Sequence, residues 1–347
     1  MIAAILVLTA FLILLSGCGR SGTEKKYNTD SHESTVVLCA GFSEYDWTRN
    51  ILGDNPSGIV LELLNTSGVD MHSYQPSVSD MVKIAGCDLL IYTGGISEFW
   101  IDKATESSGK DSVRTLSLME YFLDNPGLFP MYEQEEHDHD HGHEHNHGHE
   151  HEHEDEDANL HGHSHEHEEE ADEHIWLSLK MAPIFCEKIA DTLSHLDPEN
   201  EALYRQNLKE YCMELENLDD EFRQAVSASS GDVILFADRF PFTYMMQDYG
   251  IHAHAAFPGC SAETEASFET IIDLANDLIT DGLTHVAIIK NSSTDLAETI
   301  IRASGKKNVK ICTLDSLQSV TSADIDNGFS YIKAMKQNKE VISECLN

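Results

Sequence analysis

Two histidines that lie far apart in the sequence stand in contexts that suit metal ligands. His72 lies in the run Val-Asp-Met-His-Ser-Tyr-Gln-Pro, between an expected strand and an expected helix. In open parallel sheets, ligands bind at such loops, at the carboxyl edge of the sheet. His174 directly precedes the apolar residues 175–177, so an ordered segment can hold its ring in place. Neutral imidazole is a good zinc ligand. The alternative for His72 is a solvent-facing loop histidine without a ligand role.

Thirteen of the 20 histidines fall between residues 137 and 167. They alternate with acidic residues, and no Lys or Arg occurs between residues 133 and 173. Unperturbed imidazoles, with a pKa of ~6.5, are mostly neutral at pH 7, and interleaved carboxylates raise the local concentration of cations. We interpret residues 133–173 as a disordered loop that captures metal ions, the alternative being a solvated spacer. The thirteen histidines are His137, His139, His141, His143, His145, His147, His149, His151, His153, His161, His163, His165 and His167.

Two stretches of this loop, which begin at His143 and His149, match the H-E-x-x-H pattern of zinc proteases. That pattern works on a helix with a third ligand downstream, so a match in an acidic tract is a chance one. Neither a G-x-S-x-G motif nor a P-loop occurs in the sequence. We therefore predict that the protein is not an enzyme. A secreted metallohydrolase is the alternative, and it would need an open coordination position beside a general base.

The charge of the chain excludes one class of partner. Lys and Arg number 22 against 61 Asp and Glu, which gives a formal net charge of -39. No basic surface is available to displace counterions from a phosphate backbone, so we exclude nucleic acid. The acidic balance favours cationic partners instead.

The elements that must position His72 and His174 alternate between strand and helix. Such alternation predicts an α/β fold, with mostly parallel sheets that carry helices on their faces. An amphipathic pattern from Pro198 to Val226 predicts one long helix of roughly 40 Å between two such halves. The expected strands are residues 35–39, 58–64, 88–93, 232–237, 251–256, 285–290 and 309–313. The expected helices are residues 43–52, 76–85, 182–196, 240–249, 267–280, 293–303 and 329–346.

The N-terminus reads as a secretion signal. Residues 2–15 are almost wholly apolar and end in Leu-Ser-Gly-Cys, which resembles a bacterial lipobox with Cys18 as the lipidated residue. No Lys or Arg precedes the apolar run. We expect a signal peptide over residues 1–18 and a polar linker over residues 19–34. The seven other cysteines form no C-x-x-C pair, so a thiolate zinc site is not indicated, and the sequence does not say which of them pair.

Several of these segments together resemble one protein family. Residues 69–76 are similar to the GVDPHSYEP motif, and residues 172–178 to the DPHVWLDP motif, of the zinc and manganese solute-binding lipoproteins of ABC transporters (the ZnuA- and TroA-like, cluster A-I proteins). The segment that begins Asp197-Pro198 resembles the start of the connecting helix of that family, and the residues after Ser330 resemble its C-terminal end. The match covers nearly all of the chain after Ser34.

This resemblance implies two α/β lobes, each with a mostly parallel sheet flanked by helices, joined by one long connecting helix. It places the metal between the lobes. We expect an N-terminal lobe over residues 35–197, with the His/acidic-rich disordered loop at 133–173. The connecting helix follows over residues 198–229, and the C-terminal lobe over residues 230–347.

The resemblance also implies the ligands. His72 and His174 correspond to the first two. The family has a third His, or a Glu in manganese members, where this chain has Arg239, and a guanidinium cannot coordinate a cation. Its neighbour Asp238 could donate an oxygen or could form an ion pair with Arg239. His252 and His254, on one face of a strand, are alternatives. Asp315 corresponds to the fourth ligand, an Asp after the last strand.

We therefore expect an extracytoplasmic lipoprotein, anchored to the bacterial cell membrane through Cys18, that captures Zn²⁺. It would deliver the ion, as a monomer, to the permease and ATPase complex of an ABC importer. Replacement of an imidazole ligand by an oxygen donor shifts the metal preference of the site towards Mn²⁺. A manganese-binding protein of the same family is therefore one alternative. A metal buffer or adhesin without a transport partner is another.

Overall fold

A computed structural model describes residues 34–55, 58–107, 113–132, 171–259 and 265–347 of the chain. The predicted lipidation site Cys18 and the thirteen histidines between residues 137 and 167 lie outside these ranges. Among the described residues, no helix combines the length and the apolar composition that crossing a bilayer requires.

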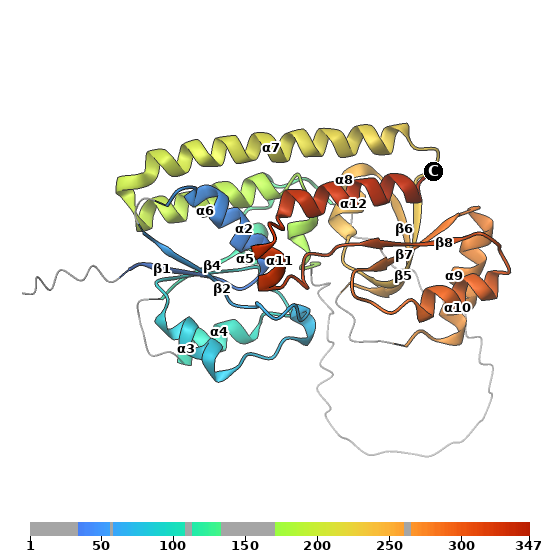
Figure 1. The fold of residues 1–347 in the computed structure, drawn as a ribbon, viewed down its shortest axis with the longest axis horizontal. Helices are drawn as coiled ribbons and strands as arrows, with labels where there is room; N and C mark the ends of the chain where they lie inside the picture. The colour runs from blue at the N-terminus through green and yellow to red at the C-terminus, as the bar shows by residue number, and fades with distance from the viewer. Residues whose placement is uncertain (1–33, 56–57, 108–112, 133–170, 260–264) are drawn as a thin grey trace, which may run out of the picture. The chain divides into compact units, whose positions relative to one another are not determined.

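The first sheet contains four parallel strands in the order β2-β1-β3-β4. Buried strands with helices on both faces follow from the apolar runs that the sequence alternates with amphipathic segments. Figure 1 shows α3 and α4 on one side of this sheet and α2 and α6 on the other. The strands are β1 (Val36–Cys39), β2 (Val60–Leu63), β3 (Leu89–Tyr92) and β4 (Arg114–Ser117), and the helices are α2 (Phe42–Leu52), α3 (Val78–Gly86), α4 (Trp100–Ser107), α5 (Leu118–Asp124) and α6 (Ala182–Leu196).

The second sheet repeats this plan, with four parallel strands in the order β6-β5-β7-β8. Helices α9 and α10 lie on one side of it, and α8 and α12 on the other (Figure 1). The strands are β5 (Val233–Phe240), β6 (His252–Pro258), β7 (His285–Ile289) and β8 (Lys310–Leu314), and the helices are α8 (Thr243–Tyr249), α9 (Phe268–Thr280), α10 (Asp295–Ser304), α11 (Ser322–Asp326) and α12 (Tyr331–Cys345).

One long helix, α7 (Glu201–Ala228), connects the two lobes after a short 3-10 turn at Pro198–Asn200. Its 28 residues correspond to about 42 Å. It packs against α2, α6 and α12, as Figure 1 shows for the last two. Its buried face is Tyr204, Tyr211, Leu215, Leu218 and Phe222. One hydrophobic core contains side chains of both lobes and of α7, for example Trp47, Tyr204 and Phe236. The predicted two-lobe α/β fold with one connecting helix is confirmed.

The structure differs from the sequence-based prediction in three places. Helix α4, strand β4 and helix α5 in the first lobe, and the short helix α11 in the second, occupy residues for which the sequence showed no clear pattern. Helix α8 begins at Thr243 rather than at Phe240, because β5 continues through Phe240, with a register shift against β6 between Phe236 and Arg239. The rings of Phe240 and Phe242 pack on Phe236, which fixes the end of the strand. Asp238 and Arg239 thereby lie at the carboxyl end of a strand.

The structure also assigns a disulfide that the sequence left open. Cys312 of β8 is bonded to Cys345 of α12. This bond ties the C-terminal helix to the last strand of the second sheet. Among the described residues, Cys39, Cys186 and Cys212 form no disulfide.

Candidate metal centre

His72 is held by a capped turn at the carboxyl edge of the first sheet. It lies in the 3-10 turn Met71–Ser73, whose N-cap is Asp70. The Oδ1 atom of Asp70 accepts the backbone N–H of His72 at 2.9 Å. Asn65 braces the same loop, because its side-chain amide donates to the carbonyl of Val69 at 2.6 Å. The imidazole is therefore placed by the loop that follows β2, as expected for a ligand at this edge of a parallel sheet.

His174 is fully buried and is fixed more tightly. The Oδ1 atom of Asp172 lies 2.8 Å from its backbone nitrogen and 2.6 Å from its Nδ1 atom. The following turn, Ile175–Leu177, is buried and anchored to the second lobe. Trp176 donates its indole N–H to the carbonyl of Ser316 at 2.9 Å, and the Tyr331 hydroxyl donates to the carbonyl of Trp176 at 2.7 Å. The apolar residues after His174 thus hold its ring still.

The two imidazoles converge, although 102 positions separate them in the chain. Their Nε2 atoms lie 3.1 Å apart. Glu173 joins them, with its Oε1 atom 3.3 Å from the Nδ1 atom of His72. Its Oε2 atom accepts the backbone N–H of Ser97 at 2.9 Å. Within the described part of the chain, His72, Glu173 and His174 are the one group of at least three His, Cys, Asp or Glu side chains whose ligand atoms all lie within 4.8 Å of one another.

The orientation of the rings directs the Nε2 atoms of His72 and His174 at each other. An ionised carboxylate accepts hydrogen bonds and donates none, so the proton of His174 resides on Nδ1, beside Asp172. The Nδ1 atom of His72 likewise faces the carboxylate of Glu173. Without a metal, one Nε2–H can donate to the other Nε2, and a cation that displaces this proton would meet both nitrogen lone pairs. Two nitrogens bound to one tetrahedral zinc at about 2.0–2.1 Å would be separated by roughly 3.3 Å, close to the separation found here.

The surroundings keep these groups in the forms that bind a cation. Burial, together with the neighbouring His174, lowers the pKa of His72 below its ordinary value and favours the neutral imidazole. Burial alone would raise the pKa of Asp172, but the charge of His174 and the hydrogen bonds from it outweigh burial. The pKa of this carboxyl is therefore lowered, and Asp172 stays ionised.

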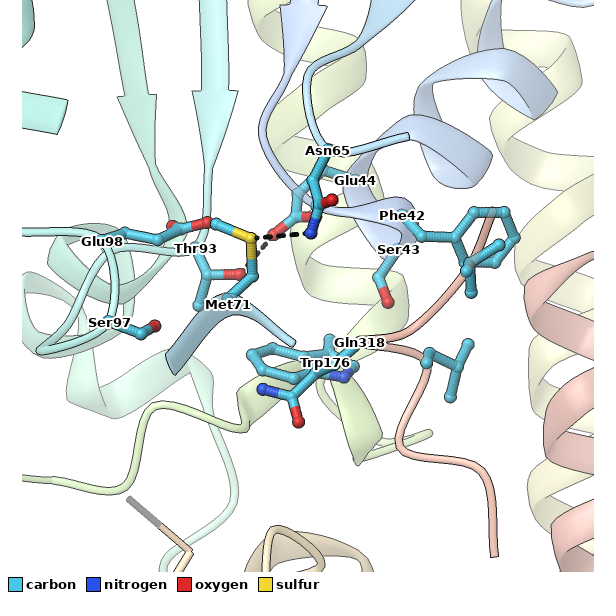
Figure 2. A pocket seen from close by; sticks show the side chains of 13 residues that line it. Phe42, Ser43, Glu44, Asn65, Met71, Thr93, Ser97, Glu98, Trp176 and Gln318 are labelled. Carbon is cyan, nitrogen blue, oxygen red and sulfur yellow. Dashed lines mark hydrogen bonds between the residues drawn. The ribbon is translucent and has the colours of Figure 1, made fainter. Parts of the chain in front are cut away.

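A small cavity of about 20 Å³ lies next to the cluster, with Met71, Ser97 and Trp176 in its wall (Figure 2). Two further buried carboxyl groups, those of Glu44 and Glu98, also line it. Burial raises the pKa of Glu44, to which the Thr93 hydroxyl donates a hydrogen bond. Burial and the nearby Glu44 raise the pKa of Glu98 well above its ordinary value. Burial therefore favours the protonated form of Glu98, which then adds little negative charge beside the cluster.

His72 also borders an open groove of about 790 Å³ between the lobes. The first lobe contributes the loops around His72 and Ser97 to its walls, and the second lobe contributes the end of β5 and the start of α10. All three members of the cluster come from the first lobe, whereas the second lobe presents Asp238 and Arg239 to the groove.

Neither predicted carboxylate ligand joins the cluster. Asp238 accepts the backbone N–H groups of Arg239 at 2.8 Å and of Ile289 at 3.0 Å. Asp315 accepts from the ammonium group of Lys290 at 2.8 Å and from the backbone N–H of Leu317 at 2.9 Å. Both carboxylates are engaged within the second lobe. Their roles as ligands stay predictions of the family resemblance.

Arg239 forms its ion pair with Asp70 at 2.8 Å rather than with its neighbour Asp238. His254 pairs with Asp281 at 2.9 Å and with Asp277 at 3.5 Å, and His252 is exposed at the start of β6. The structure therefore places neither alternative imidazole in the cluster.

Glu173 is the member of the cluster that sequence reasoning missed. It occupies the position between Asp172 and His174 where the family motif has a proline. A carboxylate next to an imidazole ligand was the available signal, because adjacent residues in a tight turn can reach one ion. The acidic run that ends at Glu173 hid this signal among many similar residues.

Comparisons with known proteins agree on one family. The family model described as the periplasmic component A of zinc-uptake complexes, ZnuA, matches residues 37–345. The zinc-binding lipoprotein AdcA of Streptococcus pneumoniae is 26% identical over 308 residues, which cover 89% of this chain and 55% of that protein. The chain thus spans about half the length of this relative.

A second relative matches over its whole length. The high-affinity zinc uptake system protein ZnuA of Bacillus subtilis is 25% identical over 344 residues, 99% of this chain and 97% of that protein. Among solved structures, the Zn(II)-bound ZnuA-like domain of Streptococcus pneumoniae AdcA has a TM-score of 0.64 at 22% identity. That match covers 90% of this chain and 99% of the domain, and it supports the fold.

Proposed function

Because this chain belongs to the ZnuA family of periplasmic zinc-uptake components, we propose that it captures Zn²⁺ outside the cytoplasm and delivers it to a membrane importer. One observation of the structure carries the proposal. Two buried or half-buried imidazoles direct their Nε2 atoms at each other across 3.1 Å, while carboxylates face both Nδ1 atoms. That arrangement suits a divalent ion that imidazole binds well, because such an ion can replace the proton between the two Nε2 atoms.

In this proposal His72 and His174 donate nitrogen ligands, and the Oε1 atom of Glu173 donates the third. Oε1 is buried and accepts no hydrogen bond from the described part of the chain. Two imidazoles and one carboxylate form a donor set common in zinc proteins, whereas manganese prefers more oxygen donors. We therefore favour zinc over manganese as the cargo. The three donors leave at least one coordination position free on the side of the groove.

The partners follow from the family. The relative from Bacillus subtilis is named as a protein of a high-affinity zinc uptake system. We propose that this chain hands its ion to a permease driven by an ATPase, as its resemblance to the solute-binding lipoproteins of ABC transporters implies. A lipid on Cys18 would tether the protein to the membrane surface, and the histidines between residues 137 and 167 would concentrate zinc near the cluster.

Zinc titration of the full mature chain against a strong chromogenic chelator tests the site, because the chelator removes zinc from the weak sites of the loop. The variant His72→Ala/His174→Ala should lose zinc at chelator concentrations that leave the wild type loaded. The variant His252→Ala/His254→Ala, which removes two histidines outside the cluster, is the matched control and should behave as wild type. Equal retention of zinc by the cluster variant would refute the site assignment.

A growth experiment separates an importer from a metal buffer or adhesin. A strain that lacks the gene should grow poorly under zinc limitation and should recover when zinc is added. The His72→Ala/His174→Ala gene should not restore growth. Normal growth of the deletion strain at limiting zinc would contradict a transport role.

A further inference from the structure

The two metal-binding histidines are built into the same local motif. In each motif an aspartate lies two residues before the histidine. Asp70 comes before His72, and Asp172 comes before His174. In each motif the Oδ1 atom of the aspartate accepts the backbone N–H of the histidine, at 2.9 Å in the first and 2.8 Å in the second. We call these two motifs the D-x-H turns. Each aspartate thus fixes the backbone of its histidine and keeps a second oxygen free for another partner.

In both D-x-H turns that second oxygen reaches the second lobe. The Oδ2 atom of Asp70 accepts from the guanidinium of Arg239 at 2.8 Å. The Oδ2 atom of Asp172 accepts from the hydroxyl of Thr243 at 2.8 Å. The next residue, Tyr244, donates its hydroxyl to the backbone carbonyl of Asp172 at 2.8 Å. The three partners lie within six residues, at the end of β5 and the start of α8.

We propose that the segment Arg239–Tyr244 is a coupling element, through which the position of the second lobe sets the geometry of the histidine pair. This inference rests on the proposed function. The second lobe contributes no member of the cluster, so it acts on the metal through Asp70 and Asp172. Movement of this segment away from the first lobe breaks one hydrogen bond to the Asp70 turn and two to the Asp172 turn, and both histidines lose their support together. Release of zinc then follows from the separation of the lobes.

The burial of these contacts supports such a role. The Asp70 side chain is 16% exposed and that of Arg239 is 24% exposed, so water screens this ion pair less than it screens a surface pair. Asp172 also holds the Nδ1 atom of His174. Loss of the Thr243 contact therefore affects the ring itself, whereas loss of the Arg239 contact affects the backbone under His72. The positioning residues are Asp70, Asp172, Arg239, Thr243 and Tyr244.

The dissociation rate of zinc, measured by stopped flow after mixing the loaded full chain with excess chelator, tests the coupling. Arg239→Met and Thr243→Val should each release zinc about tenfold faster, in line with the 10–100-fold cost of losing outer partners of metal ligands. Arg239→Lys and Thr243→Ser, which keep the charge and the hydroxyl, should recover most of the wild-type rate. For Arg239→Met the effect should shrink as salt rises, because salt weakens the wild-type ion pair.

Lys180→Met is the matched control. Lys180 also joins the first lobe to α8, through the backbone carbonyl of Asp248 at 2.6 Å, but it touches neither D-x-H turn. Its loss should leave the dissociation rate unchanged. A nitrogen NMR spectrum of His174 gives a second readout, since Thr243→Val should shift its Nδ1 signal and Lys180→Met should not.

Two outcomes distinguish failure of the coupling from failure of the function. If Arg239→Met and Thr243→Val release zinc at the wild-type rate while His72→Ala/His174→Ala fails to hold it, the coupling is wrong and the site stands. The coupling is also wrong if Lys180→Met accelerates release as much as the other two variants. If His72→Ala/His174→Ala holds zinc as the wild type does, the proposed site itself is wrong.

Discussion

The carboxyl edges of the two sheets have the same strand topology but differ in how their polar side chains are satisfied. In each sheet the first strand in the chain pairs with the second and the third strands. At the edge of the first sheet, the Oε1 atom of Glu173 is buried and accepts no hydrogen bond from the described residues, and the Nε2 atoms of His72 and His174 lie 3.1 Å apart beside it. At the edge of the second sheet, Asp315 is neutralised by Lys290, and Asp238 accepts two backbone N–H groups. A side chain is available to a metal when the fold leaves its donor atom unsatisfied, not merely when its type and place suit a ligand.

The largest effect should come from His174, the more deeply buried member of the pair. His174→Ala should lower zinc affinity by more than about a hundredfold, because even outer partners of metal ligands cost 10–100-fold. His285→Ala is the control, since His285 is a buried histidine of the second sheet outside the cluster. Chelator competition measures both. Comparable losses in the two variants would show that buried histidines matter for folding here, rather than for metal.

Glu173→Gln should have the next largest effect. The amide keeps the size of the side chain, and its oxygen can still accept the backbone N–H of Ser97, but its NH2 group then replaces Oε1 and cannot coordinate a cation. Loss of this proposed ligand and of the negative charge should lower zinc affinity by more than about tenfold, the lower limit for the loss of outer partners of metal ligands.

Glu98→Gln is the control for that change. Burial already favours the neutral form of Glu98, so an amide changes its charge little, and zinc affinity should stay at the wild-type level. If Glu98→Gln weakens binding as much as Glu173→Gln, the charge that matters does not belong to Glu173 alone.

The contrast between the two edges also explains what the sequence could and could not reveal. The strands of the two sheets other than β4 are predictable because they are apolar runs bounded by helical segments. Strand β4 was missed because its sequence, Arg-Thr-Leu-Ser, contains a single apolar residue, whereas the equally short edge strand β2 contains three. A short edge strand of this kind carries no periodic signal.

The candidate site also contains features that the local sequence indicates and features that it does not. His72 and His174 were predictable, because imidazoles are few outside the histidine-rich run and both lie at the ends of ordered segments. The engagement of Asp315 was not predictable, since its partner Lys290 comes from a different strand end. Hydrogen-bond partners that the tertiary fold supplies cannot be read from local sequence, and they decide whether a carboxylate is free to bind an ion.

Asp315→Ala compares the family resemblance with the geometry directly. The resemblance predicts a lost ligand, whereas the geometry predicts a structural effect, because Lys290 and the buried N–H of Leu317 lose their acceptor. We expect the free energy of unfolding to fall by about 1–3 kcal/mol, the usual cost of an unsatisfied buried polar group. Zinc affinity should change little. Urea unfolding and chelator competition measure the two quantities, and a hundredfold loss of affinity would identify Asp315 as a ligand in the loaded protein.

The smallest effect concerns the stability of the zinc-free protein at mildly acidic pH. Burial lowers the pKa of His72 in the folded state below its unfolded value of about 6.5. The unfolded chain therefore binds a proton first as pH falls, so the folded state loses stability from about pH 6.5 downwards, until the folded group is protonated as well. Above pH 6.5 both states are neutral at this position, and stability does not depend on it. Asp172, with its lowered pKa, contributes in the same direction at still lower pH, below about 4.

His72→Asn removes the titrating group, so the variant should lose less stability than the wild type when urea unfolding is compared between pH 7.5 and 5.5. An equal loss in both proteins would mean that His72 is not held neutral by the fold. The histidines at the edge of the first sheet would then differ from the carboxylates at the edge of the second sheet only in residue type, and not in how the fold holds them.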